Sequence, residues 1–384
     1  MGGERLRILI EGWRGVPHSY CVVGMNYCRG LLERADCDVR FLDRPLWSQT
    51  WPKIDGVLAG DNDARVQAVP APEAGWEPHV VLRTDFPMRL DPHPSARVVV
   101  TGTTEWLMAP PHTVSNADLH TALDGTRVRL ATPSEWSRNG FLRSGAPARG
   151  VVLVPLGVDT ALFRPPTAQE RGAARATLGV KDEHFVFLSL GAMTDNKGVV
   201  FILAGFAQTC MDDPRAVLVL KGLSDMYESE GRVRRVLETL PAEAVPLVEQ
   251  NTVFIGTALK LDDMVRLYHA ADAYLAPYTA EGFCLPALEA AACGLPVLCT
   301  KGGPTDDFLP KGGTIFIASD REAVSDEPGK TVLRPRLPAV MDAMRRVMAD
   351  VSLRKWAAKE SPGHVQARYT WDRSTDLLLA QLRQ

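Results

Sequence analysis

The chain alternates short apolar runs with stretches in which apolar residues recur at helical spacing, and this alternation is typical of an α/β fold. Apolar runs bounded by turn residues predict buried strands, which in the first half lie at residues 6–10, 39–42, 56–59, 79–83, 97–101, 128–131 and 151–154. The second half repeats the pattern at residues 184–190, 216–220, 252–256, 272–276, 297–300 and 314–317. Helices are expected at residues 19–34, 261–270, 287–293 and 334–349, with a last helix from residue 369.

The strand–helix pattern runs twice, which predicts two domains, each built on a parallel sheet. The length of 384 residues agrees with that number. Residues 155–166 are rich in proline, and we expect a linker from there to about residue 180. Residues 320–330 are charged and contain glycine and proline, which favours a mobile loop.

Composition and charge narrow the class of protein. The net charge of −3 gives no sign of a nucleic-acid-binding protein. The seven cysteines form no C-x-x-C pair, so neither a disulfide framework nor a zinc site is indicated. We see no signal peptide, and the longest apolar run, near residues 198–206, is too short to span a membrane. We therefore expect a cytoplasmic protein whose membrane association is at most peripheral.

The stretch from residue 281 to residue 303 carries the clearest chemical signal. A buried strand runs into a tight loop at Gly282, then into a helix that begins with Pro286 and stops at Gly294. The free N–H groups of residues 283–285 point out of this helix start, which suits a phosphate.

Two carboxylates flank this helix start. Glu281 precedes the helix, and Glu289 lies about one turn inside it. Carboxylates are poor phosphate ligands and good acceptors for sugar hydroxyls, so the stretch predicts a nucleotide-sugar site. The alternative is an ordinary strand–helix–strand unit with two exposed glutamates.

Loops at the carboxyl ends of the first-half strands carry further polar groups. Gly12 and Gly15 follow the first strand, but their spacing is not the G-x-G-x-x-G of a dinucleotide site. Arg14 and His18 in the same loop either contact substrate or are exposed to solvent. Glu105, after the strand at residues 97–101, is either an acceptor ligand or base, or a glutamate at a helix start.

Charged residues also follow other predicted strands. Lys197, at a helix start, either meets a phosphate or is a solvated lysine, and Lys221 ends a buried strand, where an anion contact is favoured. Asp61 and Asp63 form an Asp-x-Asp pattern that can hold a divalent cation but also arises by chance in surface turns. A metal-dependent transferase that uses these two carboxylates remains an alternative, and our main prediction contains no metal ligand.

Several motifs in order resemble the large retaining family of glycosyltransferases with two Rossmann domains, family 4, which has the GT-B fold. They lie at residues 131–135, 154–165, 190–198, 267–272, 281–289, 302–303 and 369–379. The resemblance implies two Rossmann-like domains that face a central cleft. Residues 1–165 would bind the acceptor, residues 180–365 would bind the nucleotide sugar, and residues 366–384 would form a helix that crosses back onto the N-terminal domain.

The resemblance also implies roles for single residues. Lys197 would contact the donor diphosphate, Glu281 the hydroxyls of the donor sugar, and Glu289 the ribose. The amides of Gly282, Phe283, Cys284 and Leu285 would surround phosphate and sugar, and Gly15 would face the donor phosphate from the other domain. Lys197 and Glu281 would be the catalytic residues.

The implied reaction needs no cofactor and no metal. The co-substrate would be a nucleotide-diphosphate sugar, with UDP- or GDP-sugars favoured, and the acceptor a hydroxyl of a saccharide or natural product. Attack from the face of the leaving group would retain the anomeric configuration. Trp13, Trp47, Trp51 and Trp106 lie in the half that would bind the acceptor, where aromatic loops suit stacking on sugars or a cyclic small molecule.

The sequence departs from the family pattern at three places. Ala192 stands where the family usually has an arginine, and we hypothesise that Lys221 supplies the second positive charge. Cys284 stands where the family has glycine. The histidine often found near the end of a middle strand has no clear counterpart, because Glu105 occupies that region. These departures keep open a catalytically silent nucleotide-sugar-binding homologue.

Overall fold

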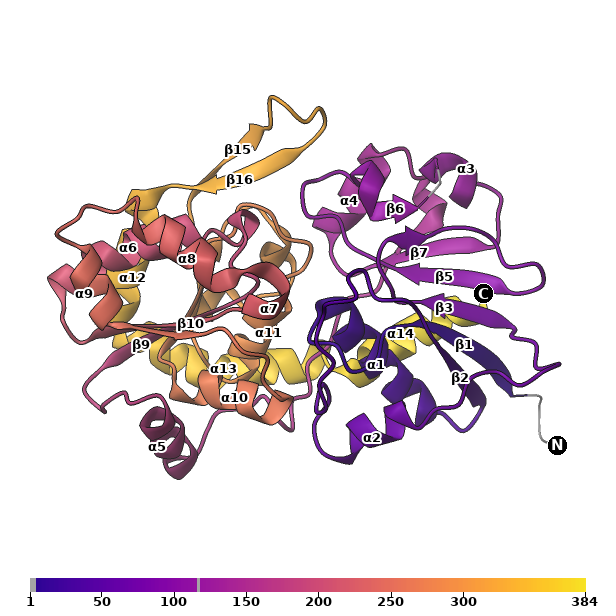
Figure 1. Cartoon of the computed structure of the whole chain (residues 1–384), viewed down its shortest axis with the longest axis horizontal. Coiled ribbons are helices and arrows are strands. Elements are labelled where there is room, and N and C mark those ends of the chain that lie inside the picture. The colour runs from indigo at the N-terminus through magenta and orange to yellow at the C-terminus, as the bar shows by residue number, and fades with distance from the viewer. Residues whose placement is uncertain (1–4, 116–117) are drawn as a thin grey trace. The chain divides into compact units, whose positions relative to one another are not determined.

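The computed structural model describes residues 5–115 and 118–384, which form two compact units. The first unit contains Met1–Gly157 and Tyr369–Gln384, and the second contains Val158–Arg368. Each unit is built on a parallel sheet of six strands with helices packed against it (Figure 1).

The sheet of the first unit has the strand order β2-β1-β3-β5-β7-β8. Its strands are β1 (Leu6–Gly12), β2 (Cys37–Asp43), β3 (Val80–Arg83), β5 (Arg97–Thr101), β7 (Val128–Thr132) and β8 (Val151–Leu153). All neighbours are parallel, with Ile8 opposite Val80 and Val98 opposite Val128. The centre of the sheet is apolar and buried, so loops at its carboxyl edge have a rigid support.

Five helices and a short strand pair complete this unit. They are α1 (Ser19–Leu32), α2 (Asp61–Gln67), α3 (Leu119–Leu123), α4 (Glu135–Arg143) and α14 (Trp371–Arg383), with β4 (Met88–Arg89) beside β6 (Val114–Ser115). The side chain of Ser134 caps α4 by accepting a hydrogen bond from the Ser137 amide.

The last helix belongs to the first unit although its residues end the chain. The Tyr27 hydroxyl lies 3.1 Å from the Ser374 hydroxyl, which donates a hydrogen bond of 2.6 Å to the Pro155 carbonyl. Trp371 packs edge-on against Tyr27 with ring centroids 5.7 Å apart. In Figure 1 this helix, in yellow, runs beside α1.

The sheet of the second unit has the order β11-β10-β9-β12-β13-β14 and is also parallel throughout. Its strands are β9 (Phe185–Leu190), β10 (Ala216–Lys221), β11 (Thr252–Ile255), β12 (Ala273–Ala276), β13 (Val297–Thr300) and β14 (Thr314–Ile317). Its helices are α5 (Ala168–Thr177), α6 (Val199–Asp212), α7 (Ser224–Tyr227), α8 (Ser229–Leu237), α9 (Val245–Gln250), α10 (Leu261–Ala270), α11 (Leu285–Ala292), α12 (Leu337–Ala349) and α13 (Val351–Arg368).

Three local predictions are wrong. Residues 56–59 form no strand, because the chain there bends into α2. The expected linker up to residue 180 contains α5, which is held in the second unit by Arg171 and Arg175, whose guanidinium groups lie 2.6 and 3.2 Å from the Asp272 carboxylate. The loop predicted at residues 320–330 is wrong for residues 320–323, which belong to β15 (Ser319–Ala323) in an antiparallel hairpin with β16 (Thr331–Pro335), whereas residues 324–330 form the loop between these strands.

The hairpin also shifts the start of the helix that was expected at residue 334, because Arg334 and Pro335 belong to β16 and α12 begins at Leu337. Helix α13 was not predicted at all. Over residues 5–115 and 118–384, no helix is both long enough and apolar enough to cross a membrane.

Candidate functional site

Two loops meet at the carboxyl edge of the second sheet. One follows β9 and ends in a turn of 3₁₀ helix, Asp195–Lys197, and the other follows β12. The two loops approach each other closely at Gly198. A Cβ on this residue would lie 2.0 Å from the Pro277 carbonyl oxygen, and its φ is +72°. The amide of Thr279 donates a 2.8 Å hydrogen bond to the Asn196 carbonyl, so the two loops hold each other in place.

This junction brings together the two residues that were predicted to be catalytic. The Lys197 ammonium lies 2.6 Å from a carboxylate oxygen of Glu281. The side chains of Lys197 and Glu281 are 25% and 13% exposed, so the pair is accessible at the rim of the site. The other Glu281 oxygen accepts a 3.1 Å hydrogen bond from the amide of Gly282.

Helix α11 begins directly after this pair. Its cap residue is Cys284, which has φ +72° and ψ +61°, in the left-handed region that favours glycine. This turn places the amides of residues 283–285 at the helix start, where helix geometry leaves them without helical partners. The arrangement is suited to an anion next to the Lys197 ammonium.

Glu289 lies in the second turn of α11. Its carboxylate accepts a 2.5 Å hydrogen bond from the hydroxyl of Tyr268, which is buried and stacked against Tyr274. Burial raises the pKa of Glu289 to about 7, although the bond from Tyr268 opposes the shift. This carboxyl group therefore changes its charge near neutral pH.

Lys221 ends β10 and is only 4% exposed. Its ammonium donates to the Gly222 carbonyl, and burial lowers its pKa to about 8. Within residues 5–115 and 118–384, no carboxylate lies within ion-pair distance of it. The Lys221 carbonyl accepts a 3.0 Å hydrogen bond from Gly191, and the Lys197 side chain passes 3.4 Å from where a Gly191 Cβ would be, so both lysines stand at the same sheet edge.

In the first unit the structure separates the predicted residues. Arg14 binds both Asp43 oxygens and the carbonyls of Val66, Gln67 and Val69, so its guanidinium holds the loop together instead of facing a ligand. Gly15 has φ +72°, and its carbonyl accepts a 2.7 Å bond from Ile54. Its role at the donor phosphate stays a prediction.

His18 caps α1 and lies in a continuous row of six rings. Its Nδ1 accepts a 3.2 Å hydrogen bond from the Tyr20 amide. Neighbouring rings in the row have centroids 5.1–5.7 Å apart, in the order Trp47, Phe86, Tyr20, His18, Trp51 and Trp13. Trp47 is 56% exposed, so one end of the row is open to solvent.

Glu105 follows β5 and is half-buried. Its backbone carbonyl accepts a 2.9 Å hydrogen bond from the Trp136 indole. Burial raises the pKa of Tyr20 to about 12, and the charges of Glu105 and Asp85 add to the shift. The charge of Glu105 therefore acts on one ring of the row.

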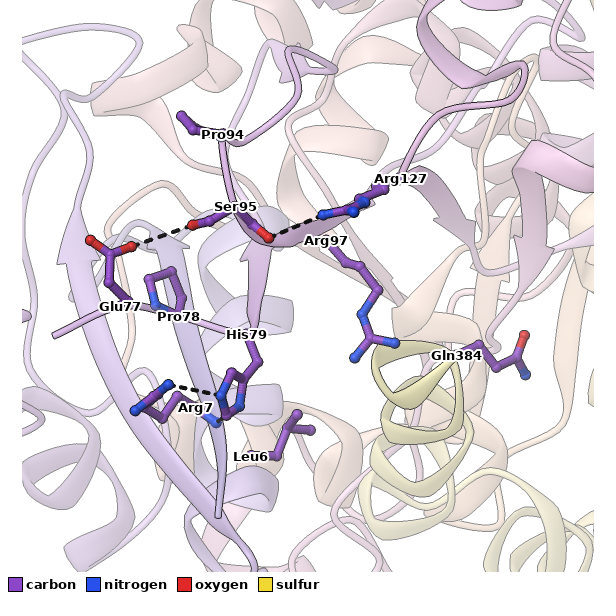
Figure 2. Close-up of a pocket in the computed structure, with 10 residues that line it drawn as sticks. All are labelled: Leu6, Arg7, Glu77, Pro78, His79, Pro94, Ser95, Arg97, Arg127 and Gln384. Atoms are coloured by element: carbon purple, nitrogen blue, oxygen red, sulfur yellow. Dashed lines mark hydrogen bonds between the residues drawn. The ribbon is translucent and has the colours of Figure 1, made fainter. Parts of the chain in front are cut away.

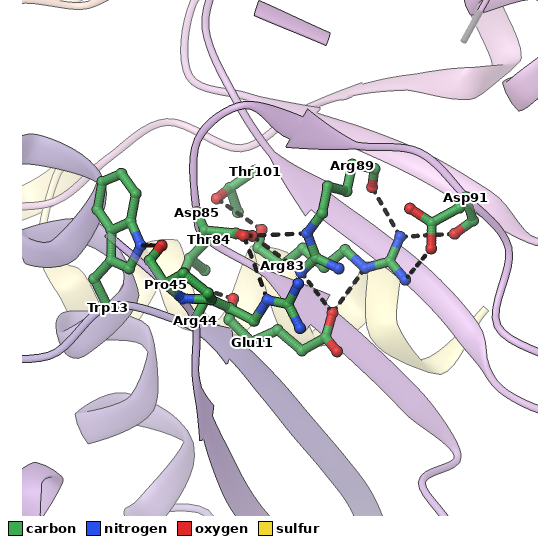
Figure 3. Close-up of polar contacts among 10 residues, drawn as sticks. All are labelled: Glu11, Trp13, Arg44, Pro45, Arg83, Thr84, Asp85, Arg89, Asp91 and Thr101. Atoms are coloured by element: carbon green, nitrogen blue, oxygen red, sulfur yellow. Dashed lines mark hydrogen bonds and ion pairs between the residues drawn. The ribbon is translucent and has the colours of Figure 1, made fainter. Parts of the chain in front are cut away.

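A network of ion pairs at the carboxyl ends of β1 and β3 was not predicted. Glu11 and Arg83 end the apolar runs of β1 and β3, and their side chains lie 2.9 Å apart (Figure 3). Arg89 joins Glu11 at 2.7 Å to Asp85 at 3.1 Å. Although burial opposes ionisation, these guanidinium groups hold the pKa of Glu11 below its usual value. The sequence signal for this network is a charged residue at the end of a buried run, as at Lys221.

Asp61 and Asp63 lie in the first turn of α2 rather than after a strand. Asp63 is buried and accepts a 3.0 Å hydrogen bond from the Leu58 amide. In the part of the chain that the structure describes, no group of three or more His, Cys, Asp or Glu side chains could hold a metal ion.

Comparison with known proteins agrees with this geometry. Residues 170–327, which contain the Lys197–Glu281 pair and α11, match the family "Glycosyl transferases group 1". This segment of the chain therefore belongs to the glycosyl transferases of group 1. A D-inositol 3-phosphate glycosyltransferase of Actinosynnema mirum is 31% identical over 262 residues, which are 67% of this chain and 57% of that protein.

A second relative of this chain is a GDP-mannose-dependent monoacylated alpha-(1-6)-phosphatidylinositol monomannoside mannosyltransferase of Corynebacterium glutamicum. It is 28% identical over 242 residues, which are 60% of this chain and 56% of the relative. The chain thus spans little more than half the length of these two relatives.

Solved structures confirm the GT-B fold with its two Rossmann-like domains. An Anabaena HepE structure in complex with UDP and glucose has a TM-score of 0.68 at 17% identity and covers 99% of this chain and 100% of that chain. Sucrose-phosphate synthase from Thermosynechococcus elongatus has a TM-score of 0.71 at 19% identity and covers 99% of this chain and 98% of that chain. At these identities the likeness concerns the fold alone.

Proposed function

We propose that the protein transfers a sugar from a nucleotide-diphosphate sugar to a hydroxyl of a saccharide or natural-product acceptor, with retention of configuration. The observation that carries the proposal is the contact of Lys197 with Glu281 directly before the start of α11. Among the relatives, one is named as GDP-mannose-dependent and one HepE structure holds UDP and glucose, so we keep UDP- and GDP-sugars as the favoured donors.

In the proposed mechanism, binding of the donor breaks the ion pair between Lys197 and Glu281. The diphosphate oxygens replace Glu281 at the Lys197 ammonium, and Glu281 then accepts hydrogen bonds from the hydroxyls of the donor sugar. The amides of Phe283, Cys284 and Leu285 and the ammonium of Lys221 surround the diphosphate. The Glu289 carboxylate accepts from the ribose.

Charge develops on the departing diphosphate in the transition state, and these fixed donors stabilise it. The acceptor oxygen bonds to the anomeric carbon on the face from which the phosphate oxygen leaves, and the acceptor proton passes to that phosphate oxygen. Because Lys197, Lys221 and the helix start supply positive charge, we propose that no divalent cation is required.

We further propose that the first unit binds the acceptor along the six-ring row. Aromatic faces stack on the C–H faces of sugars and cyclic natural products, and the nearby Glu105 carboxylate can accept their hydroxyls. In this proposal His18 and Glu105 contact the acceptor, and Arg14 acts only through the loop that it holds.

The test is nucleotide release and product analysis with UDP- and GDP-sugars, a panel of saccharide acceptors, and either magnesium or a chelator. Release that depends on the acceptor, persists with chelator and yields a product with the donor's anomeric configuration would support the proposal. Loss of release with chelator would favour the alternative at Asp61 and Asp63. Ala192, in place of the family's arginine, motivates a second candidate, a silent homologue, which would bind nucleotide without releasing sugar.

A further inference from the structure

A row of basic side chains crosses the amino edge of the first sheet, opposite the edge that carries the six rings. Arg7 lies in β1, His79 directly precedes β3, Arg97 begins β5, and Arg127 directly precedes β7. These strands are neighbours in the sheet. Backbone hydrogen bonds link the four positions in turn, from His79 to Arg7 at 2.9 Å, from Arg97 to His79 at 3.2 Å, and from Val98 to Arg127 at 3.0 Å.

The four side chains line one hollow of about 1030 Å³ (Figure 2). The other residues that line it are Leu6, Glu77, Pro78, Pro94, Ser95 and Gln384. Figure 2 shows the Arg97 guanidinium extending into the open space, with no hydrogen bond to the residues drawn. Arg127 donates a 3.3 Å hydrogen bond to the Ser95 carbonyl.

Arginine side chains outnumber acidic side chains in the lining of this hollow. Among residues 5–115 and 118–384, no carboxylate lies within ion-pair distance of Arg97 or Arg127. Glu77 is the one acidic residue of the lining, and its carboxylate accepts from the Ser95 hydroxyl at 3.3 Å. Arginines with a carboxylate partner in the same unit include Arg14, Arg34, Arg40, Arg83, Arg89 and Arg149.

Arg97 begins β5 and Arg127 directly precedes the neighbouring β7, and like charges at adjacent positions of paired strands repel and destabilise the pairing. A bound anion would remove this repulsion. Guanidinium groups offer parallel N–H donors that match phosphate oxygens, and the hollow is large enough for more than a single phosphate.

We propose that this hollow is a second ligand site, which binds a phosphate-bearing anion through Arg97 and Arg127. The site is independent of the proposed transfer reaction, because the donor residues lie in the second unit and the ring row lies at the opposite sheet edge. The phosphate belongs either to a soluble phosphorylated compound or to the headgroup of an anionic lipid, and both sources present the same chemistry to the arginines.

The test is calorimetric titration of the full chain with pyrophosphate in a Lys197→Ala background, which weakens the proposed diphosphate site at α11. Adding Arg97→Gln and Arg127→Gln should weaken pyrophosphate binding about tenfold or more, since two charge-assisted contacts are lost. The matched control is Arg65→Gln, which removes an exposed charge of the same unit and should leave binding unchanged. Arg127→Gln alone, at an exposed position, serves if the double change impairs folding.

Two results would overturn the proposal. One is the absence of pyrophosphate binding to the Lys197→Ala chain, and the other is binding that the arginine changes leave intact. Co-sedimentation with phosphatidylglycerol vesicles, but not with phosphatidylcholine vesicles, that is lost in the arginine variant would assign the site to a lipid headgroup. Pyrophosphate binding without co-sedimentation would assign it to a soluble compound.

Discussion

At the scale of single residues, three side chains around α11 have environments that set their charge or conformation. Cys284 takes a left-handed backbone conformation, Glu289 is an acid with a pKa of about 7, and Lys221 is a buried base with a pKa of about 8. Each of these environments leads to a testable prediction.

Cys284→Gly should leave stability nearly unchanged and preserve donor binding. Relief of left-handed strain, about 1 kcal/mol, is offset by the greater freedom of glycine in the unfolded chain and the loss of a small buried side chain. Cys284→Val should be clearly destabilising and raise the KM for the donor, because a β-branched residue tolerates φ +72° poorly and the turn that aims the amides would shift. Thermal melts and donor kinetics measure both. Equal behaviour of the two variants would show that the left-handed turn is not required.

Donor affinity should rise as the pH is raised from 6 to 8, because the Glu289 carboxyl loses its proton near pH 7 and the ionised form is the better acceptor for ribose hydroxyls. Since this pKa lies above the usual 4.5, Glu289 contributes stability at low pH that is lost as pH rises from about 4.5 through 7. Glu289→Gln should remove the step in nucleotide affinity. A step that persists in this variant would assign it to another group.

Lys221→Met should raise the dissociation constant for the donor nucleotide about tenfold or more if its ammonium contacts the diphosphate. The loss should be largest below pH 8, where the wild-type side chain is charged. Lys355→Met, at an exposed position of α13, is the control. Calorimetry with UDP and GDP measures the effect, and an unchanged constant would end the idea that Lys221 replaces the family's arginine.

At the scale of elements, the donor site depends on how the two loops of the second sheet meet. The loop after β9 carries Lys197, and the loop after β12 carries Glu281. Gly198 sets their distance, and the amide of Leu333 in β16 adds a 2.7 Å bond to the Thr279 carbonyl in the second loop. The hairpin β15–β16 is therefore tied to the backbone that leads to Glu281.

Gly198→Ala should cost more than about 2 kcal/mol and strongly reduce transfer, because a Cβ would meet the Pro277 carbonyl oxygen at 2.0 Å and φ is +72°. The loops would separate and move Lys197 from Glu281. Gly172→Ala in α5 is the matched control, since nothing lies within 4 Å of its Cβ position. There a small gain of about 0.5–1 kcal/mol is expected. Urea unfolding and initial rates compare the two, and similar losses would refute the steric argument.

At the scale of the whole molecule, the two ends of the chain lie in one unit. Helix α14 packs on α1 through Tyr27, Trp371 and Ser374, while the rest of the chain from Val158 to Arg368 builds the other unit. The first unit is therefore complete only when the final residues of this chain have been added.

Trp371→Ala should destabilise the first unit by about 3–5 kcal/mol, because a 4% exposed indole leaves a large cavity. Amide hydrogen exchange should rise in α1 and α14 and stay unchanged in β9 and β10 of the second unit. Trp356→Ala, at a 38% exposed indole of the second unit, is the control and should leave exchange in α1 unchanged. Uniform exchange across both units would contradict the independence of the units.

The sequence by itself determined the positions along the chain of the strands of the two six-stranded sheets, the start and end of α10, the bounds of α11 to within two residues, and the family resemblance. These rest on short-range signals, such as apolar runs between turn residues, Pro286 at a helix start and Gly294 at its end. The same locality explains the errors, since nothing nearby in sequence shows that Arg171 and Arg175 reach Asp272 or that residues 319–335 pair as a hairpin.

Only the tertiary structure decided which predicted residues meet. Lys197 and Glu281 are 84 positions apart and in contact, whereas Arg14, equally plausible as a ligand, is committed to Asp43 and three carbonyls. The residues of the six-ring row come from three segments that are distant in sequence, and the residues of the basic row lie at the amino ends of four strands. Such contacts depend on register and packing between distant segments, which no local pattern of residues encodes.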